Sequence, residues 1–401
     1  MKRRLFMMWT ILMVLFESGC SNRTELNKLG IINAIAYDLD EKNQWVLTFQ
    51  VIIPKSTQSK SGGGSQSPVT VYSAKGKTIL EAIQKSELEA PRHLFFSHTQ
   101  AIIISRRVAE YGINQLLDSN LRSYESRENT NVLLSDGDAS KVLEVLTPIE
   151  TIPGNAISNL TSEQGDRQSN LVPSRIHDLM SIMTNHSASA TLQEIKISGE
   201  QQGQTSLDIL KKTRSMAVMK LDRVGVFKQD KFVGWLSRNE SLGLPWITNR
   251  LKKKTIVFSC EGEKQNDKLS SFLVGKSRTA LKPKISDGNL LMSVEIDTKG
   301  SFIETACHLD LKKAEALNRL EKYIQEQIKK EVELSFQAVK KMKADTLGFG
   351  DAFHKAYPQA WKKLSKNWED EFAEVKMDVK VKVTIQRTGM IDDSFSKISG
   401  E

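Results

Sequence analysis

The amino-acid sequence predicts a mixed α+β protein made of three lobes, each with a β-sheet packed by helices. Strand-like segments alternate with helical segments early in the chain, an uninterrupted amphipathic helix occupies residues 312–343, and an alternating strand follows at residues 375–385. A chain of 401 residues with 39% hydrophobic and 26% charged residues is long enough for two or three globular units.

The N-terminal lobe is predicted to open with three strands. Residues 30–40 and 44–54 are aliphatic and joined by a short polar turn, a pattern typical of a β-hairpin. A Gly/Ser-rich stretch follows, and because it cannot bury apolar area we expect a long hairpin loop there. We then expect a strand at residues 68–76, helices at 78–90, 106–120 and 138–146, and strands at 98–105 and 131–135. This alternation indicates an α/β arrangement around a central buried strand at residues 101–104.

In the middle of the chain the predicted structure changes from alternating strands and helices to a polar, irregular segment and then mostly strands. Residues 148–173 are polar and irregular, an amphipathic helix follows at residues 174–183, and strands are expected at residues 191–199 and as a hairpin within residues 216–237. We therefore divide the chain into a signal peptide (1–19), an N-terminal α/β domain (20–184), a middle β-rich domain (185–254) and a C-terminal α+β domain (255–401). The last two can also count as one domain.

The C-terminal lobe carries the strongest periodicity. Strands are expected at residues 255–260, 290–300 and 301–309. The helix that follows lacks Gly and Pro, and its apolar residues recur every three or four positions: Leu317, Leu320, Ile324, Ile328, Val332, Phe336, Val339 and Met342. In the closing strand, apolar residues at every second position from Val375 to Ile385 predict one buried face and one wet face.

The first residues have the pattern of a lipoprotein signal peptide. A basic start is followed by an apolar segment at residues 5–16, which is too short to span a bilayer of about 30 Å as a helix. Ser18 and Gly19 before Cys20 resemble the lipobox of bacterial lipoproteins, in which the cysteine receives a diacylglyceryl group and becomes the new N-terminus. Glu17 departs from that pattern, since Leu is usual there. A plain signal peptide cut elsewhere is the alternative.

Other features of the composition point to no particular chemistry. Cys260 and Cys307 lie in predicted strands, where they either form a disulfide or pack as two separate core residues. The formal net charge of +9 is spread over many lysines, which suits a solvated surface or a nearby anionic membrane and lacks the concentrated basic patch of a nucleic-acid binder.

A search for catalytic, cofactor and metal sites yields no candidate. The sequence has no HExxH, CxxC or GxSxG motif, and its six histidines are scattered. Gly76 to Thr78 are best interpreted as a strand-to-helix turn, and the acidic pairs Asp136/Asp138 and Glu369/Asp370 as caps or solvated charges. We read Gly348 and Gly350 as positions required by backbone geometry. We therefore predict no catalytic residue, no cofactor and no metal, with Cys20 as the single site residue.

Several segments together resemble one family along nearly the whole chain. They are Cys20 with the strand after it, SHTQAIIIS running into RRVAEYGI, RVGVFKQDKFVGWLSRNESLGLPWI, and KADTLGFGDAFHKAYPQAWKKLSKNWEDEF followed by VKVKVTIQRTG. In this order they resemble the C subunits of bacterial spore germinant receptors, the Ger(x)C lipoproteins.

This resemblance implies a lipid-anchored protein that is not an enzyme. Family members are exported to the outer face of the spore inner membrane and work there with membrane-embedded A and B receptor subunits, and their fold is mixed α and β in three lobes. The preferred hypothesis is therefore a structural or adaptor subunit anchored through Cys20. The rival hypothesis is a lipoprotein that binds the nutrient directly, which requires a cleft with converging polar groups. An exported enzyme is a third possibility, for which the sequence offers no constellation of residues.

Overall fold

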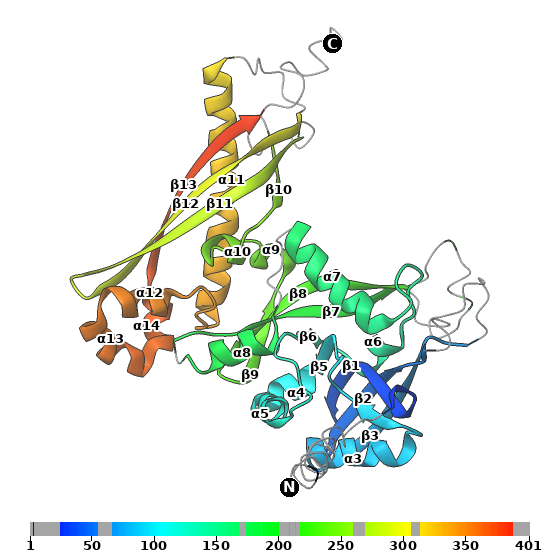
Figure 1. The fold of residues 1–401 in the computed structure, drawn as a ribbon. Coiled ribbons are helices and arrows are strands. Elements are labelled where there is room, and N and C mark those ends of the chain that lie inside the picture. The colour runs from blue at the N-terminus through cyan, green and yellow to red at the C-terminus, as the bar shows by residue number, and fades with distance from the viewer. Residues whose placement is uncertain are drawn as a thin grey trace.

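The computed structural model describes residues 25–54, 66–167, 174–185, 187–199, 217–259, 269–305 and 313–387, with the single positions 3, 208 and 213. These residues form two sheets with helices packed on them, and the molecule is elongated, with one sheet toward each end (Figure 1). The fold is mixed α+β with a long C-terminal helix followed by a long strand, as the sequence predicts.

The strands of the larger sheet are β1 (Leu29–Leu39), β2 (Trp45–Ile52), β3 (Val69–Gly76), β4 (His93–Phe95), β5 (Ala101–Ser105), β6 (Asn131–Ser135), β7 (Thr191–Gly199), β8 (Ala217–Lys228) and β9 (Lys231–Leu236). Their order is β3-β2-β1-β5-β6-β7-β8-β9, with β4 beside β1. The central strands β1, β5, β6 and β7 are parallel, and antiparallel pairs extend the sheet on both sides. The predicted hairpins β1–β2 and β8–β9 and the buried central strand β5 are confirmed.

Helices cover both faces of this sheet. One face carries α3 (Ile79–Glu89), α4 (Arg106–Tyr111), α5 (Asn114–Arg122) and α8 (Ile176–Met183), and the other carries α6 (Ser140–Glu144) and α7 (Pro153–Arg167). Thr78 caps α3 by accepting a hydrogen bond from Glu81 N, which confirms the predicted strand-to-helix turn. Burial on both faces explains why β5 and β6 are continuous apolar runs without alternation.

The structure corrects two predicted elements of this lobe. Residues 148–173 are not irregular throughout, because α7 starts at Pro153 and buries Ala156 and Ile157; proline suits the first turn of a helix. The single helix expected at residues 106–120 is divided in two at Gly112. This glycine has φ +125°, and a Cβ there would lie 2.5 Å from Asp230 Oδ2.

The smaller sheet is antiparallel except for its last strand. It contains β10 (Lys254–Ser259), β11 (Leu269–Ser286), β12 (Asn289–Thr305) and β13 (Lys376–Arg387) in that order, with β13 parallel to β12. Helix α11 (Ala314–Lys341) packs on one face, and its predicted apolar stripe lies in the core. In β13 Val379 and Val383 are buried and Val381 is half-buried, so the predicted alternation is confirmed.

Two strands of the smaller sheet differ from the expected ones. β11 was not predicted, since Gly275 and Pro283 argue against a strand. β10 pairs with β11 only as far as Val274, so Pro283 lies where β11 has a free edge and needs no amide donor. The strands expected at residues 290–300 and 301–309 are one strand, β12. Gly300, at the expected boundary, lies within this strand and packs closely against β11, since a Cβ there would lie 2.2 Å from Leu273 O.

The remaining helices connect the two sheets or lie beside the smaller one. They are η1 (Leu26–Lys28) at the start of β1, α9 (Arg238–Ser241) and α10 (Leu244–Ile247) between the sheets, and α12 (Phe349–Ala356), α13 (Pro358–Leu364), η3 (Ser365–Asn367) and α14 (Trp368–Glu374) between α11 and β13.

The strands expected in a separate middle lobe are part of the larger sheet. β7 pairs with the central strand β6, and β8 and β9 continue from it, so the boundary placed at residue 184 does not separate two sheets. Val224, Val226 and Leu236 of β8 and β9 also belong to the hydrophobic core of the smaller sheet and α11. The described residues thus form two sheets joined by a shared core.

Candidate functional site

The predicted lipidation residue, Cys20, lies outside the described residues. The chain resumes at Glu25, so Cys20 lies within roughly 20 Å of that residue even if the intervening chain is fully extended. Cys260, Cys307 and most of the Gly/Ser-rich stretch in which a hairpin loop is expected also fall outside the described ranges, and the pairing of the two cysteines remains a prediction.

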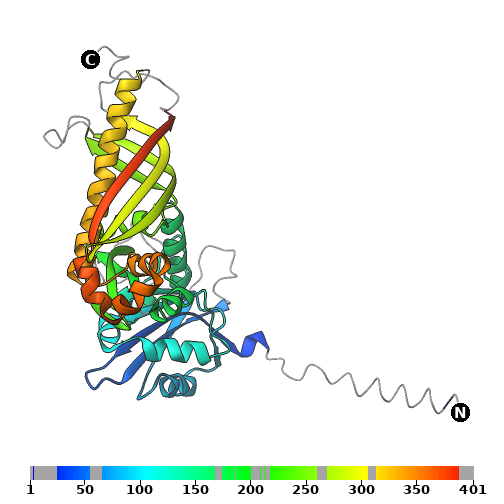
Figure 2. The same ribbon diagram turned by 90° about the vertical axis from the view of Figure 1, so that its left-hand side faces the viewer.

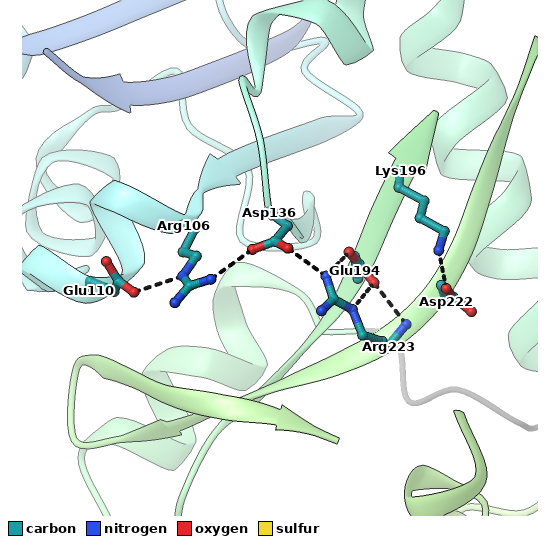
Figure 3. A network of polar contacts seen from close by, with 7 residues as sticks. All are labelled: Arg106, Glu110, Asp136, Glu194, Lys196, Asp222 and Arg223. Atoms are coloured by element: carbon teal, nitrogen blue, oxygen red, sulfur yellow. Dashed lines mark hydrogen bonds and ion pairs between the residues drawn. The ribbon is translucent and has the colours of Figure 1, made fainter. Parts of the chain in front are cut away.

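Charged side chains cluster at the edge of the larger sheet where its parallel strands end (Figure 3). Arg106 follows β5 and Asp136 follows β6, and their side chains are 3.3 Å apart from Nη1 to Oδ1. Arg223 of β8 contacts Asp136 at 2.8 Å and Glu194 of β7 at 2.6 Å. Glu110 completes the network at Arg106 Nε, 2.7 Å away. Ligands of open α/β sheets commonly bind at this edge, which makes the network a candidate site.

The charges of this network are satisfied by one another. Arg223 donates to both oxygens of Glu194 and lies 4.3 Å above the ring of Trp235. The hydrogen bond to Glu194 raises the pKa of Arg223. Burial alone would raise the pKa of Asp136, but hydrogen bonds and charge from Arg223 and Arg106 outweigh burial and lower it. Both groups therefore stay ionised near neutral pH, and the arrangement suits a structural clamp between strands better than general acid–base chemistry.

A polar pocket of about 610 Å³ continues along the same edge. Its most buried charge is Asp38, which accepts hydrogen bonds from Ser105 Oγ at 2.6 Å and from Arg107 Nε at 2.9 Å and Nη2 at 2.8 Å. Asp138 accepts from Ser140 at the start of α6, as expected of a turn residue. The prediction for Asp138 is confirmed, whereas Asp136 forms ion pairs with Arg106 and Arg223 instead of acting as a cap or a free solvated charge.

The histidines and acidic side chains of the described ranges form no group of three or more that could hold a metal ion. His93 pairs with Glu87 at 2.8 Å, and His98 packs against the ring of Phe95. Within the same ranges, no helix has the length and apolar character needed to cross a membrane.

The two lobes meet at a second candidate site, which we call the junction. It consists of the loop containing Asn185 and Ser187–Ser189, helices α9 and α10, and the loop from Lys343 to Gly348 with α12. Asn185 Nδ2 donates to Asp351 Oδ1 at 2.8 Å, and the backbone N–H of Ser189 donates to the carbonyl of Asp345 at 2.8 Å. A Cβ on Gly350 would lie 2.7 Å from Ser187 Cβ, so only glycine permits this approach. Gly348 has φ +77° at the start of α12, and both glycines confirm the prediction of a backbone role.

Asp345 is the centre of the junction on the side of the smaller sheet. Its buried carboxylate accepts backbone N–H groups of Leu347, Phe349 and Gly350 at 2.7 to 3.1 Å, and Trp368 Nε1 at 3.0 Å. Burial raises the pKa of this carboxyl group, and the four donors partly offset that effect. The carboxylate thereby fixes the loop that precedes α12 and connects it to α14.

A buried ion pair fixes the junction to α11. Lys254 Nζ lies 2.7 Å from Glu331 Oε2, and that oxygen also accepts from Trp246 Nε1 at 3.0 Å. Burial lowers the pKa of Lys254, while the charge of Glu331 opposes that shift. Gly243 N donates to Ser335 Oγ at 2.7 Å, which holds α10 close against α11.

An open groove of about 730 Å³ lies beside the junction and is lined by both lobes. It has apolar and polar walls, and the charged residues among them are Arg250, Asp345, Asp351 and Lys355. Sequence reasoning missed this site, because residues from four distant segments form it. The available signals were the Leu-Gly-Phe-Gly turn and the Gly-Leu-Pro-Trp segment, both of which lie at the junction.

Comparisons with known proteins agree on one family. The family model "Spore germination protein N-terminal domain" matches residues 22–197, and "Spore germination B3/GerAC like, C-terminal" matches residues 222–389. The division between the two models falls near β8, within the larger sheet.

Relatives of Bacillus subtilis (strain 168) match along nearly their full length. Spore germination protein KC is 28% identical over 387 residues, covering 95% of this chain and 94% of the relative. Spore germination protein B3 is 24% identical, covering 92% and 95%, and spore germination protein A3 is 23% identical, covering 97% and 98%.

A solved structure titled "Crystal Structure of the GerBC protein" has the same fold. It superposes with a TM-score of 0.57 at 19% identity and covers 88% of this chain and 96% of that one. Since both family models, the full-length relatives and the fold agree, this chain belongs to the Ger(x)C family of spore germination proteins.

Proposed function

We propose that this chain is the lipid-anchored C subunit of a spore germinant receptor. In this role it sits on the outer face of the spore inner membrane, joined to lipid through Cys20, and works with the membrane-embedded A and B subunits. Its contribution is to the assembly or signalling of the receptor, and it is not an enzyme.

The observation that carries this proposal is the full-length similarity to spore germination proteins. The relatives are all named as spore germination proteins, and this chain matches them along nearly the whole of the sequence. The subunit role, the partners and the membrane location extend beyond that similarity and rest on the resemblance to receptor C subunits.

The shared core between the lobes supports an adaptor role. Val224, Val226 and Leu236 pack into the same core as α11, and Asn185 and Ser189 add hydrogen bonds to the opposite lobe. A clamp that closes on a ligand needs a hinge with few such contacts. Two lobes joined by a shared core form a rigid protein, which suits a subunit that holds its partners at a fixed separation.

The lipid anchor suits this location energetically. One acyl chain gives only marginal membrane binding, with a partition constant of ~10⁴ M⁻¹, whereas two chains anchor a protein stably. A diacylglyceryl group on Cys20 supplies two chains, and the chain between Cys20 and Glu25 is short enough to keep η1 and β1 close to the bilayer.

Affinity purification from spore membranes tests the subunit role. A tagged copy of this chain should recover the membrane-embedded A and B subunits, and spores without the chain should lose the response to the nutrient of that receptor. Recovery of the chain without either subunit, in detergents that keep a known receptor intact, would contradict the proposal.

The groove at the junction favours direct nutrient binding as a second candidate function. Both lobes line it, and Arg250 and Asp351 provide opposite charges that could meet a zwitterionic ligand. This function requires saturable binding of a germinant to the purified chain, which isothermal titration calorimetry measures. Loss of that binding in Arg250→Ala, with binding kept in Arg319→Ala on the exposed face of α11, would place the ligand in the groove.

A further inference from the structure

The outward face of the smaller sheet is strongly basic. We define the basic face as the outward residues at alternate positions 276–284 of β11, 291–299 of β12 and 376–384 of β13. Its cations are Lys276, Arg278, Lys282, Lys284, Lys299, Lys376, Lys380 and Lys382, and its anions are Glu295, Asp297 and Asp378. Eight positive and three negative side chains give this face a net charge of +5.

Strand register concentrates these charges in one continuous surface. Lys276 pairs with Lys299, Arg278 with Asp297 and Lys284 with Leu291, and the same β12 residues are paired with β13 on their other side. Neighbouring strands lie about 4.8 Å apart and alternate residues about 7 Å apart, so the cations form a dense, extended array.

Most of these cations form no ion pair with an acidic side chain. Within the described residues, ion pairs on this face join Lys282 to Glu295 and Lys380 to Asp378. The other six cations make no ion pair with any described residue. Solubility and resistance to aggregation require only charged side chains, and a mixture of both signs provides them. The excess of positive charge therefore indicates that this face binds an anionic surface outside the molecule.

The direction in which the basic face points indicates that the anionic surface is a lipid bilayer. In Figure 2 the smaller sheet lies to the right of α11, and η1, which precedes β1, also projects from the right-hand side of the molecule. Helix α11 covers the opposite face of the sheet. A bilayer that holds Cys20 near η1 would therefore lie on the side toward which the basic face points.

We propose that the basic face docks against the headgroups of an anionic phospholipid bilayer. The molecule then lies along the membrane, held by lipid near the larger sheet and by charge at the smaller sheet. This orientation rests in part on the proposed anchor at Cys20, whereas the affinity of the basic face for anionic lipid does not require it.

Vesicle binding of the mature chain with Cys20→Ser tests the proposal, since neither acylation nor receptor partners contribute to it. We expect binding to vesicles with about 30% phosphatidylglycerol, little binding to neutral phosphatidylcholine, and loss of binding when salt is raised toward about 0.5 M. Each cation near an anionic surface contributes about fivefold in the partition coefficient, so the triple variant Lys276→Gln/Arg278→Gln/Lys382→Gln should bind about a hundredfold more weakly.

A matched control removes the same charge from the other side of the sheet. Arg319, Lys322 and Lys341 are exposed on α11, and Arg319→Gln/Lys322→Gln/Lys341→Gln should change binding only slightly. Equal losses in the two triple variants, or no binding to anionic vesicles, would overturn the proposal. If vesicles do not bind but the first triple variant still abolishes germination in spores, the face belongs to an acidic protein partner instead of a bilayer.

These outcomes are independent of the proposed function. Vesicle binding can fail while the A and B subunits are still recovered with the chain, and that result would leave the subunit role intact. Recovery of the subunits can fail while vesicle binding persists, and that result would leave the basic face as a membrane surface of a protein with another role.

Discussion

Asp345 and Asp136 both accept several hydrogen bonds, but they differ in how far they are buried. Asp345 is 3% exposed and accepts from four donors of the junction and α14, whereas 38% of the Asp136 side chain is exposed. An unsatisfied donor in a buried site costs far more than a lost contact at the surface. Substitution and pH should therefore act differently on the two carboxylates.

Asp345→Asn should destabilise the protein by about 3 kcal/mol or more. An asparagine keeps one acceptor oxygen, but its NH₂ group would face two of the four donors, and each unsatisfied buried donor costs about 1–3 kcal/mol. Chemical denaturation of the purified chain measures this loss. Asp370→Asn, at an exposed ion pair with Lys343, is the control and should change stability by less than about 1 kcal/mol. Equal stability of Asp345→Asn and wild type would show that the carboxylate does not hold the loop.

Asp136→Asn should lower stability by about 1 kcal/mol or less near pH 7, because its pairs are partly exposed and screened. The pKa of Asp136 is lower in the folded chain than in the unfolded chain. Its contribution is therefore present above the unfolded pKa of about 3.9 and is lost as pH falls through the folded pKa. Melting temperatures of both proteins from pH 7 downward should converge in acid. A difference in melting temperature that grows as pH falls would contradict a lowered pKa for Asp136.

At the scale of elements, the sequence predicted helices and strands best where buried residues recur at a single helical or strand period along one segment. The stripe of α11 and the alternation of β13 were predicted because each element buries a single face. α7 was missed because Pro153 and Gly154 at its start are turn residues and few of its positions are apolar. β11 was missed because Gly275 and Pro283 disfavour a strand, and the free edge that tolerates Pro283 exists only in the assembled sheet.

The junction could not be predicted from local pattern. Asn185, Trp246 and Asp345 come from three segments far apart in sequence, and none of them shows a motif that indicates its partners. Polar residues at such positions look like ordinary loop residues until the fold brings them together. The charged network at the edge where the parallel strands end was equally hidden, because Arg106, Asp136 and Arg223 also come from separate segments.

The ion pair between β10 and α11 gives a prediction at the same scale. Lys254→Met leaves Glu331 buried without its cation and should cost about 3–5 kcal/mol. The double variant Lys254→Met/Glu331→Gln removes both charges, and the side-chain oxygen of the introduced glutamine can still accept the hydrogen bond from Trp246 Nε1. It should therefore be more stable than Lys254→Met alone. Chemical denaturation of the two single variants and the double variant supplies the coupling free energy. Additive losses would show that the two charges do not interact.

At the scale of the whole molecule, the shared core makes the two lobes one mechanical unit. Core residues of β8 and β9 pack with those of α11, so neither sheet can be exposed without opening the other. We therefore predict one cooperative unfolding transition. Scanning calorimetry should give a van't Hoff enthalpy close to the calorimetric enthalpy. Two resolved transitions would contradict the shared core and favour independent lobes.

The central claim is that lipid on Cys20 determines where the protein works and not whether it folds. Cys20→Ala is the most direct test, measured as the fraction of the chain that sediments with spore membranes. Circular dichroism and melting temperature should stay unchanged, because Cys20 precedes every element of both sheets. We predict that the variant leaves the membrane fraction or binds it weakly, that the nutrient response of the spores weakens, and that mass spectrometry finds a diacylglyceryl group on Cys20 of the wild type. An unmodified Cys20 on a chain that remains membrane-bound would contradict the account.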